Sequence, residues 1–179
     1  NLDLNKTGVV VRARRIQGGA GDTVIKLRPV DPAAIEHELR RSASFKTEID
    51  VVPGGFVCSG SFKGRCTADE VLDAVGGKTR LASLFSKEQR GFYSKHAPHG
   101  IALDSLQTFG PTFVLKVRLW SKPLQRRFVV EMWLFPDGSL VVELSTKCLP
   151  GEGLRVADET RTFLESKGLE LTGEQQTKT

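Results

Sequence analysis

Charged side chains recur at every second position along several stretches of this 179-residue sequence whose residue types favour β-strands. Successive side chains of a strand point to opposite faces of its sheet, so residues two apart share one face. Arginine and lysine form such pairs on three stretches, and carboxylates join a cation on three more. The positions are Arg12 and Arg14; Lys26 and Arg28; Lys46, Glu48 and Asp50; Lys116 and Arg118; Arg127 and Glu131; and Glu143, Ser145 and Lys147.

This mixture of cations and carboxylates suits a chain of phosphates bound together with a divalent metal ion. Arginine binds phosphate oxygens through paired N–H groups, and lysine supplies a point charge. Carboxylates are the ligands that Mg²⁺ and Mn²⁺ prefer. A closed or nearly closed sheet with this face inward would form a basic tunnel for a triphosphate or polyphosphate. If the face points to solvent instead, the same residues form an ordinary solvated surface.

The segments that carry these residues predict an α+β fold with antiparallel strands joined by short turns. Glycine-rich or proline-containing turns are expected at 17–22, 53–55 and 136–138. Strands are predicted at 8–15, 23–28, 45–52, 56–63, 112–120, 127–135 and 139–147. The residues from Lys63 to Arg65 are expected to form a solvated turn after the fourth strand.

Three helical segments are expected between and after the strands. Asp31 followed by Pro32 predicts a short helix that ends near Arg41. Thr67 and Glu70 match a capping box, which predicts a helical insert over 67–96. Apolar positions at helical spacing predict a last helix over 154–167. Residues 1–172 are therefore expected to form a single domain, and 173–179 a polar tail.

Composition and cysteine usage narrow the class of protein. Three cysteines without a C-x-x-C motif or a nearby histidine argue against a disulfide framework or a zinc site and favour a cytoplasmic location. No apolar run is long enough to span a bilayer, and no secretory signal is present. Because the chain starts at Asn1, without an initiator Met, a longer natural N-terminus is expected. The net charge of +5 favours an anionic partner without identifying it.

Several other function classes are disfavoured by what the sequence lacks. There is no G-x-S-x-G motif for a serine nucleophile, and the glycines at 18–21 join two strands and so do not form a phosphate-binding loop before a helix. With 7% aromatic residues and one tyrosine, the sequence offers no aromatic platform for stacking RNA bases. An RNA-binding module is thus the least favoured reading. The sequence does not predict an oligomeric state.

Four segments follow one another in the order LDLNKTGVVVRARR, TVIKLR, FKTEID and RRFVVEMWLFPDGSLVVELSTK. In this order they resemble the motifs of the CYTH domain, the triphosphate tunnel metalloenzyme superfamily. The resemblance covers most of the chain and implies an eight-stranded antiparallel tunnel with a helical insert and a C-terminal helix. It also implies binding and hydrolysis of a triphosphate, inorganic or organic, with Mg²⁺ or Mn²⁺; adenylate cyclase activity is a less favoured variant.

The resemblance assigns roles to individual residues. It implies phosphate contacts for Arg12, Arg14, Lys26 and Arg118, and Arg28, Lys46, Lys116 and Lys147 share their face as further substrate-binding candidates. Glu48 and Asp50 become tunnel carboxylates and candidate metal ligands. Glu131 and Glu143 become the catalytic carboxylates, which would hold the metal ion or its water.

Two departures from the family pattern leave a second reading open. The family's first strand, E-x-E-x-K, is not in this chain and would precede Asn1. Ser145 stands where the family has the second glutamate of a pair, which removes one carboxylate from the metal cluster. The alternative is therefore a domain that binds a polyphosphate or nucleotide without hydrolysing it.

Overall fold

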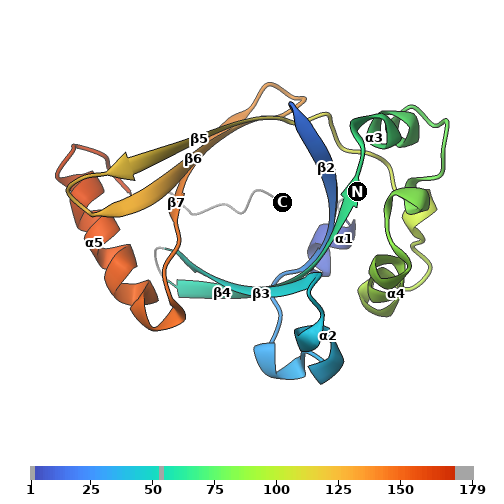
Figure 1. The fold of residues 1–179 in the computed structure, drawn as a ribbon, viewed down its shortest axis with the longest axis horizontal. Coiled ribbons are helices and arrows are strands. Elements are labelled where there is room, and N and C mark those ends of the chain that lie inside the picture. The colour runs from blue at the N-terminus through green and yellow to red at the C-terminus, as the bar shows by residue number, and fades with distance from the viewer. Residues whose placement is uncertain (1–2, 53–54, 172–179) are drawn as a thin grey trace. The chain divides into compact units, whose positions relative to one another are not determined.

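The computed structural model describes residues 3–52 and 55–171, which form an α+β fold with two antiparallel sheets (Figure 1). Part of the predicted turn at 53–55 and the predicted tail at 173–179 lie outside the described residues. The chain divides into two compact units. Among the described residues, the first contains 3–50 and Phe56–Thr108, and the second contains Val51, Val52, Gly55 and 109–171.

The first unit is built on a four-stranded sheet with the order β1-β2-β4-β3. Its strands are β1 (Val9–Ile16), β2 (Gly19–Leu27), β3 (Phe45–Val52) and β4 (Gly55–Cys66). The helices of this unit are α1 (Asp3–Lys6), α2 (His37–Arg41), α3 (Ala68–Val75) and α4 (Lys87–His96), with 3₁₀ turns η1 (Pro32–Ala34), η2 (Leu81–Leu84) and η3 (Leu103–Ser105).

The helical insert covers the apolar face of this sheet. Phe45 of β3, Phe62 of β4 and Phe92 of α4 meet with ring centroids 5.6–6.0 Å apart. Ile25 of β2 is fully buried in the same cluster. Two of these contacts are edge-to-face and the third, between Phe62 and Phe92, is tilted, and such contacts add to the free energy gained by burying the rings. This cluster is the core of the first unit.

A buried glutamine ties α4 to the sheet. The Gln89 Nε2 donates to the carbonyl oxygens of Thr23 and Phe62 at 3.3 and 3.2 Å, and its Oε1 accepts from the Thr23 hydroxyl and the Ser86 N–H. Gln89 is 0% exposed, so all these groups would be costly to leave without partners. Ser86 and Gln89 also form a capping box at the start of α4.

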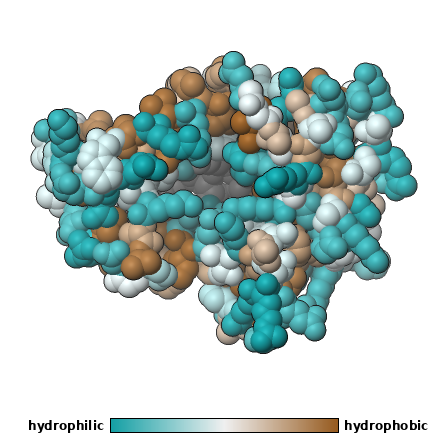
Figure 2. All heavy atoms as spheres, in the orientation of Figure 1, coloured by the Kyte–Doolittle hydropathy of each residue, from teal (hydrophilic) through white to brown (hydrophobic). Residues whose placement is uncertain are grey.

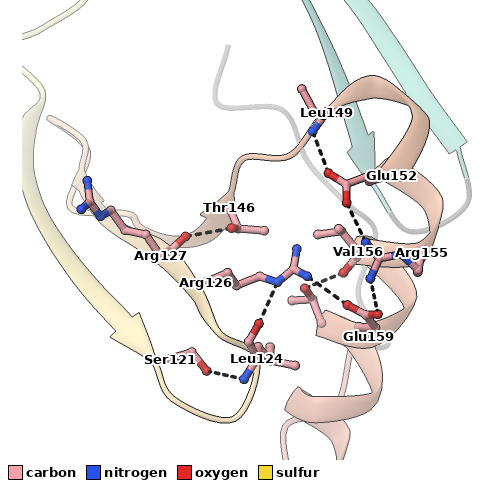
Figure 3. A network of polar contacts seen from close by, with 11 residues as sticks. Ser121, Leu124, Arg126, Arg127, Thr146, Leu149, Glu152, Arg155, Val156 and Glu159 are labelled. Atoms are coloured by element: carbon pink, nitrogen blue, oxygen red, sulfur yellow. Dashed lines mark hydrogen bonds and ion pairs between the residues drawn. The ribbon is translucent and has the colours of Figure 1, made fainter.

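The second unit is built on a three-stranded sheet with the order β5-β6-β7. Its elements are β5 (Phe113–Ser121), β6 (Arg126–Leu134), β7 (Leu140–Thr146), the 3₁₀ turn η4 (Pro150–Glu152) and α5 (Gly153–Glu165). Arg126 of β6 and Arg155 of α5 both bind Glu159, at 3.0 and 2.6 Å (Figure 3). This network holds α5 at the end of the sheet where β5 turns into β6.

The predicted order of the strands is confirmed, but three predictions of element limits are wrong. The first hairpin turns at Gln17 and Gly18, so that Gly19–Asp22 belongs to a strand and not to a loop. Gly21 explains this difference, since a Cβ there would lie 2.6 Å from the Arg14 carbonyl oxygen. Only glycine lets the strands approach so closely.

The fourth strand also exceeds its predicted end. It continues to Cys66, and Thr23 of β2 pairs with Gly64 within this extension. The short helix over 31–41 instead divides into η1 and α2, because the backbone of Ile35 is extended, with φ −73° and ψ 122°. The Arg40 guanidinium donates to the carbonyl oxygens of Pro32, Ala33 and Ile35 at this break.

The strand pairing found among the described residues leaves two separate sheets of four and three strands. The α+β class with antiparallel sheets and a C-terminal helix is thus confirmed. A closed eight-stranded barrel is not found in this part of the chain, and the tunnel stays a prediction. No helix of the described ranges is both long and apolar enough to cross a membrane.

Candidate functional site

The polar face of the four-stranded sheet collects most of the predicted cations of the first unit. Val9 and Ile25 face the core, so Arg12, Arg14 and Lys26, at the alternate positions, lie on the other face. On β3, Phe45 faces the core, which places Lys46, Glu48 and Asp50 on the polar face. The sequence prediction that these residues share a face is therefore confirmed within this unit.

Lys26 lies at the centre of a dense group of charges. Burial lowers its pKa most; Asp50 and Glu48 oppose this shift, and the positive charges of Arg28 and Arg12 add to it. Arg28 and Asp50 also form an ion pair at 3.5 Å. Three cations and two carboxylates from three strands thus meet on one face. The lowered pKa shows that burial and repulsion together outweigh the attraction of the carboxylates.

Arg14 has a partner that sequence reasoning did not assign to it. It forms an ion pair with Asp22, the residue directly opposite on β2. Asp22 belongs to β2 and not to the turn that the sequence predicts at 17–22. A ligand at this end of the sheet would therefore meet Arg14 already oriented by a carboxylate.

Two further cations belong to the same face and were missed. Lys63 pairs with Val24 and Arg65 with Asp22, so both extend the polar face along β4. Their alternation with Ser59 and Ser61 was the available signal. Gly64 hides this signal, because a glycine usually indicates the end of a strand; here the absence of a Cβ makes room for Gln89 and Thr23.

Two guanidinium groups on this face carry buried N–H donors that lack an acceptor. The Nε atoms of Arg14 and Arg28 are shielded from solvent and have no hydrogen-bond partner among the described residues. The Oδ1 atom of Asp22 is likewise buried without a donor. Buried donors of charged groups are costly to leave unsatisfied. The guanidinium groups themselves stay partly accessible, since the Arg14 and Arg28 side chains are 36% and 21% exposed, so an anion on this face can contact them.

The second unit has a polar face of a different composition. Lys116 of β5, Glu131 of β6 and Glu143 of β7 lie side by side across the sheet. The Lys116 Nζ donates to Glu131 Oε1 at 2.7 Å, and the Glu131 side chain is only 12% exposed. Directly opposite carboxylates repel each other unless a cation lies between them. The row is therefore arranged to hold positive charge.

The remaining predicted residues of this unit lie close to that row. Arg118 and Val129 pair across β5 and β6, and Ser145 pairs with Val129, one step along the sheet from Glu131 and Glu143. Lys147 follows β7 by one residue. All of these positions have the parity of the polar face, as the sequence predicted.

The carboxylates form a pair and not a complete metal cage. Within the part of the chain that the structure describes, no group of three or more His, Cys, Asp or Glu side chains could hold a metal ion. Mg²⁺, however, is often held by one or two carboxylates together with the oxygens of a phosphate substrate. Glu131 and Glu143 fit that mode of binding, in which the substrate supplies the other ligands.

The three cysteines are free thiols. Cys58 and Cys66 are buried free thiols, and Cys148 is an exposed one. The cytoplasmic location stays a prediction.

Comparison of this chain with protein-family models, with curated proteins and with solved structures finds no match.

Proposed function

We propose that this protein binds a triphosphate or polyphosphate through the cations on the polar face of its four-stranded sheet. The observation that carries the proposal is the group around Lys26. There Arg12 and Arg28 help to lower the lysine pKa, and the buried Nε of Arg28 has no acceptor among the described residues. A polyanion on this face would reduce the repulsion among the cations and accept hydrogen bonds from the accessible part of the Arg28 guanidinium.

The carboxylates of this group explain why a phosphate chain fits better than a single phosphate. Asp50 binds Arg28, and Glu48 also lies near Lys26. Repulsion from these carboxylates would offset most of the attraction between a single phosphate and the cations. A triphosphate carries several negative charges along its length and can contact several cations at once. It can contact Arg12, Arg14 and Lys26 at successive positions.

The same proposal includes a divalent metal ion at the polar face of the three-stranded sheet. Glu131 and Glu143 would hold Mg²⁺ or Mn²⁺, and the bound ion would neutralise charge on phosphate oxygens. Lys116 would keep Glu131 oriented, since its ammonium already binds that carboxylate. The resemblance to CYTH domains implies that all these residues line one tunnel, and we include this arrangement in the proposal.

Hydrolysis of the bound triphosphate is the second candidate function. The pairing of Glu131 with Glu143 favours it, because two opposed carboxylates can hold a metal ion beside a phosphate. Ser145 lies on the same face and leaves one carboxylate fewer than the family pattern requires. Binding without turnover is therefore the first proposal, and turnover depends on this pair.

Calorimetric titration of the full chain with tripolyphosphate, with and without Mg²⁺, tests the binding site. Arg28→Gln should weaken binding about tenfold, because it removes a charge-assisted contact. Lys87→Gln is the matched control, since it removes one positive charge from α4, which packs on the apolar face of the sheet. It should change affinity less than about twofold. Absence of binding at millimolar tripolyphosphate, or equal losses in both variants, would overturn the proposal.

A phosphate-release screen over tripolyphosphate, ATP and thiamine triphosphate tests turnover. Glu143→Gln should lower release much more than it lowers metal-free binding, whereas Ser145→Glu should tighten metal affinity by adding a carboxylate. If the wild type releases no phosphate with Mg²⁺ or Mn²⁺ while tripolyphosphate still binds, the protein is a binder and not a hydrolase.

A further inference from the structure

The face of the three-stranded sheet opposite to Glu131 and Glu143 is apolar at nearly every position. The alternate residues of β5, β6 and β7 from Phe113 to Leu144 are Phe, Leu, Val or Met on all three strands. Charged residues are confined to the other face and to Arg126 at the end of β6. Such a face is typical of a sheet that packs against another layer.

Only one end of this face is covered within the second unit. Phe163 and Leu164 of α5 lie near Leu119, Phe128 and Leu144, around an apolar groove of about 530 Å³. The ion pair of Arg126 with Glu159 fixes α5 at that end (Figure 3). α5 therefore leaves the rest of the sheet face without a layer of its own.

The uncovered part is large for the surface of a monomer. Six large apolar side chains on it are each 43–63% exposed, and Figure 2 shows hydrophobic atoms gathered over β5 and β6. They present on the order of 600 Å² of surface, the upper end of the apolar patches found on monomeric proteins. We call this surface the open face; it consists of Phe113, Leu115, Val117, Leu134, Leu140 and Val142.

We propose that the open face is the contact between two copies of this chain, which associate as a symmetric dimer with their three-stranded sheets packed face to face. The open face carries no charge, so a second copy meets no electrostatic repulsion there. Two antiparallel sheets pack with their inner faces about 10 Å apart, which suits rows of Leu, Val and Phe. A two-fold axis lets the same patch serve both partners.

The area of the open face fits contact with a second copy of the chain. Two open faces together would bury on the order of 1,200 Å², the lower limit of stable protein interfaces. We therefore expect a dimer of moderate affinity that dissociates on dilution.

Sedimentation velocity of the full chain between about 5 and about 200 µM tests the proposal without any substitution. The wild type should shift from monomer to dimer within that range. Leu115→Glu and Val142→Glu should each give a monomer at the highest concentration, because a charge would be buried against the partner's apolar side chains. Leu154→Glu, on α5 and outside the open face, is the control and should leave the dimer intact.

Circular dichroism of each variant shows whether it keeps its fold. Should a glutamate variant not fold, Leu115→Thr keeps strand propensity and should still weaken the dimer at least threefold. A wild type that is monomeric over the whole range, or a dimer that survives both Leu115→Glu and Val142→Glu, overturns the proposal. A monomer that captures a different partner on this face also overturns it.

Discussion

The two sheets share one design but differ in what covers their apolar faces. In the four-stranded sheet, Ile25 and Phe62 lie under the helical insert and are 0% and 5% exposed. In the three-stranded sheet, Leu115 and Val142 occupy equivalent alternate positions and are 48% and 63% exposed. Strand alternation gives each sheet an apolar face, but burial of that face depends on whether helices of the same unit reach it.

The difference in burial between the two apolar faces arises because the two units contain different numbers of helical segments. Between β4 and β5 the chain contributes α3, η2, α4 and η3, whose apolar residues join the core of the first unit. After β7 it contributes η4 and α5. Such a comparison shows that an alternating pattern identifies the two faces of a sheet without saying which face is buried.

The largest expected effect is the difference in stability lost when a large apolar side chain is cut to alanine in each of the two apolar layers. Phe92→Ala should lower the free energy of unfolding by about 3–5 kcal/mol, because it leaves a cavity between Phe45 and Phe62. Leu115→Ala should cost less than about 1 kcal/mol in the monomer, since the side chain is half exposed. Urea denaturation at low protein concentration measures both. Equal losses would mean that the second face is as well packed as the first.

A smaller effect on stability is expected from Lys26→Met. This variant tests the polar face of the four-stranded sheet both in the free protein and in the protein with bound tripolyphosphate. The substitution removes a partly buried charge whose pKa is lowered mainly by burial, so the melting temperature of the free protein should rise by about 2 °C. Tripolyphosphate binding should weaken in the same variant. A fall in both quantities would show that Lys26 stabilises the fold through Asp50 and Glu48.

The pH dependence of this effect has a definite sign. The folded state holds the Lys26 pKa below its ordinary value of 10.5, so the unfolded chain binds more protons in the window between the two values. The contribution of Lys26 to stability therefore rises as pH rises through that window. The stability difference between wild type and Lys26→Met should accordingly narrow at alkaline pH.

The smallest effect concerns His96, whose ring lies 4.8 Å from that of Phe92 at the edge of the first core. Burial lowers its pKa below 6.5, with a further contribution from Lys95. Below pH 6.5 the unfolded chain takes up the proton more readily, so stability falls as pH falls through this window. Between about pH 7.5 and 5.5 the wild type should lose about 1–2 °C more in melting temperature than His96→Phe. Identical pH profiles would contradict this assignment.

The sequence determined the order of elements because each carries its own local signal. The capping box of Thr67 and Glu70 begins α3, and the turn at 136–138 joins β6 to β7, as predicted from residue types alone. The shared face of Arg12 with Arg14 also follows from strand parity. These features depend on neighbours in the chain, which a sequence displays directly.

Tertiary structure alone decided which charged residues form ion pairs and which sheet face is covered by helices. The register between strands decides which side chains meet across a sheet. It brings Arg14 to Asp22 and Lys116 to Glu131. It also lets β4 continue through Gly64. Whether an apolar face is buried depends on helices that come from elsewhere in the chain, as the contrast between Ile25 and Val142 shows. Periodicity records which side chains share a face, but contact energies between distant segments decide what that face meets.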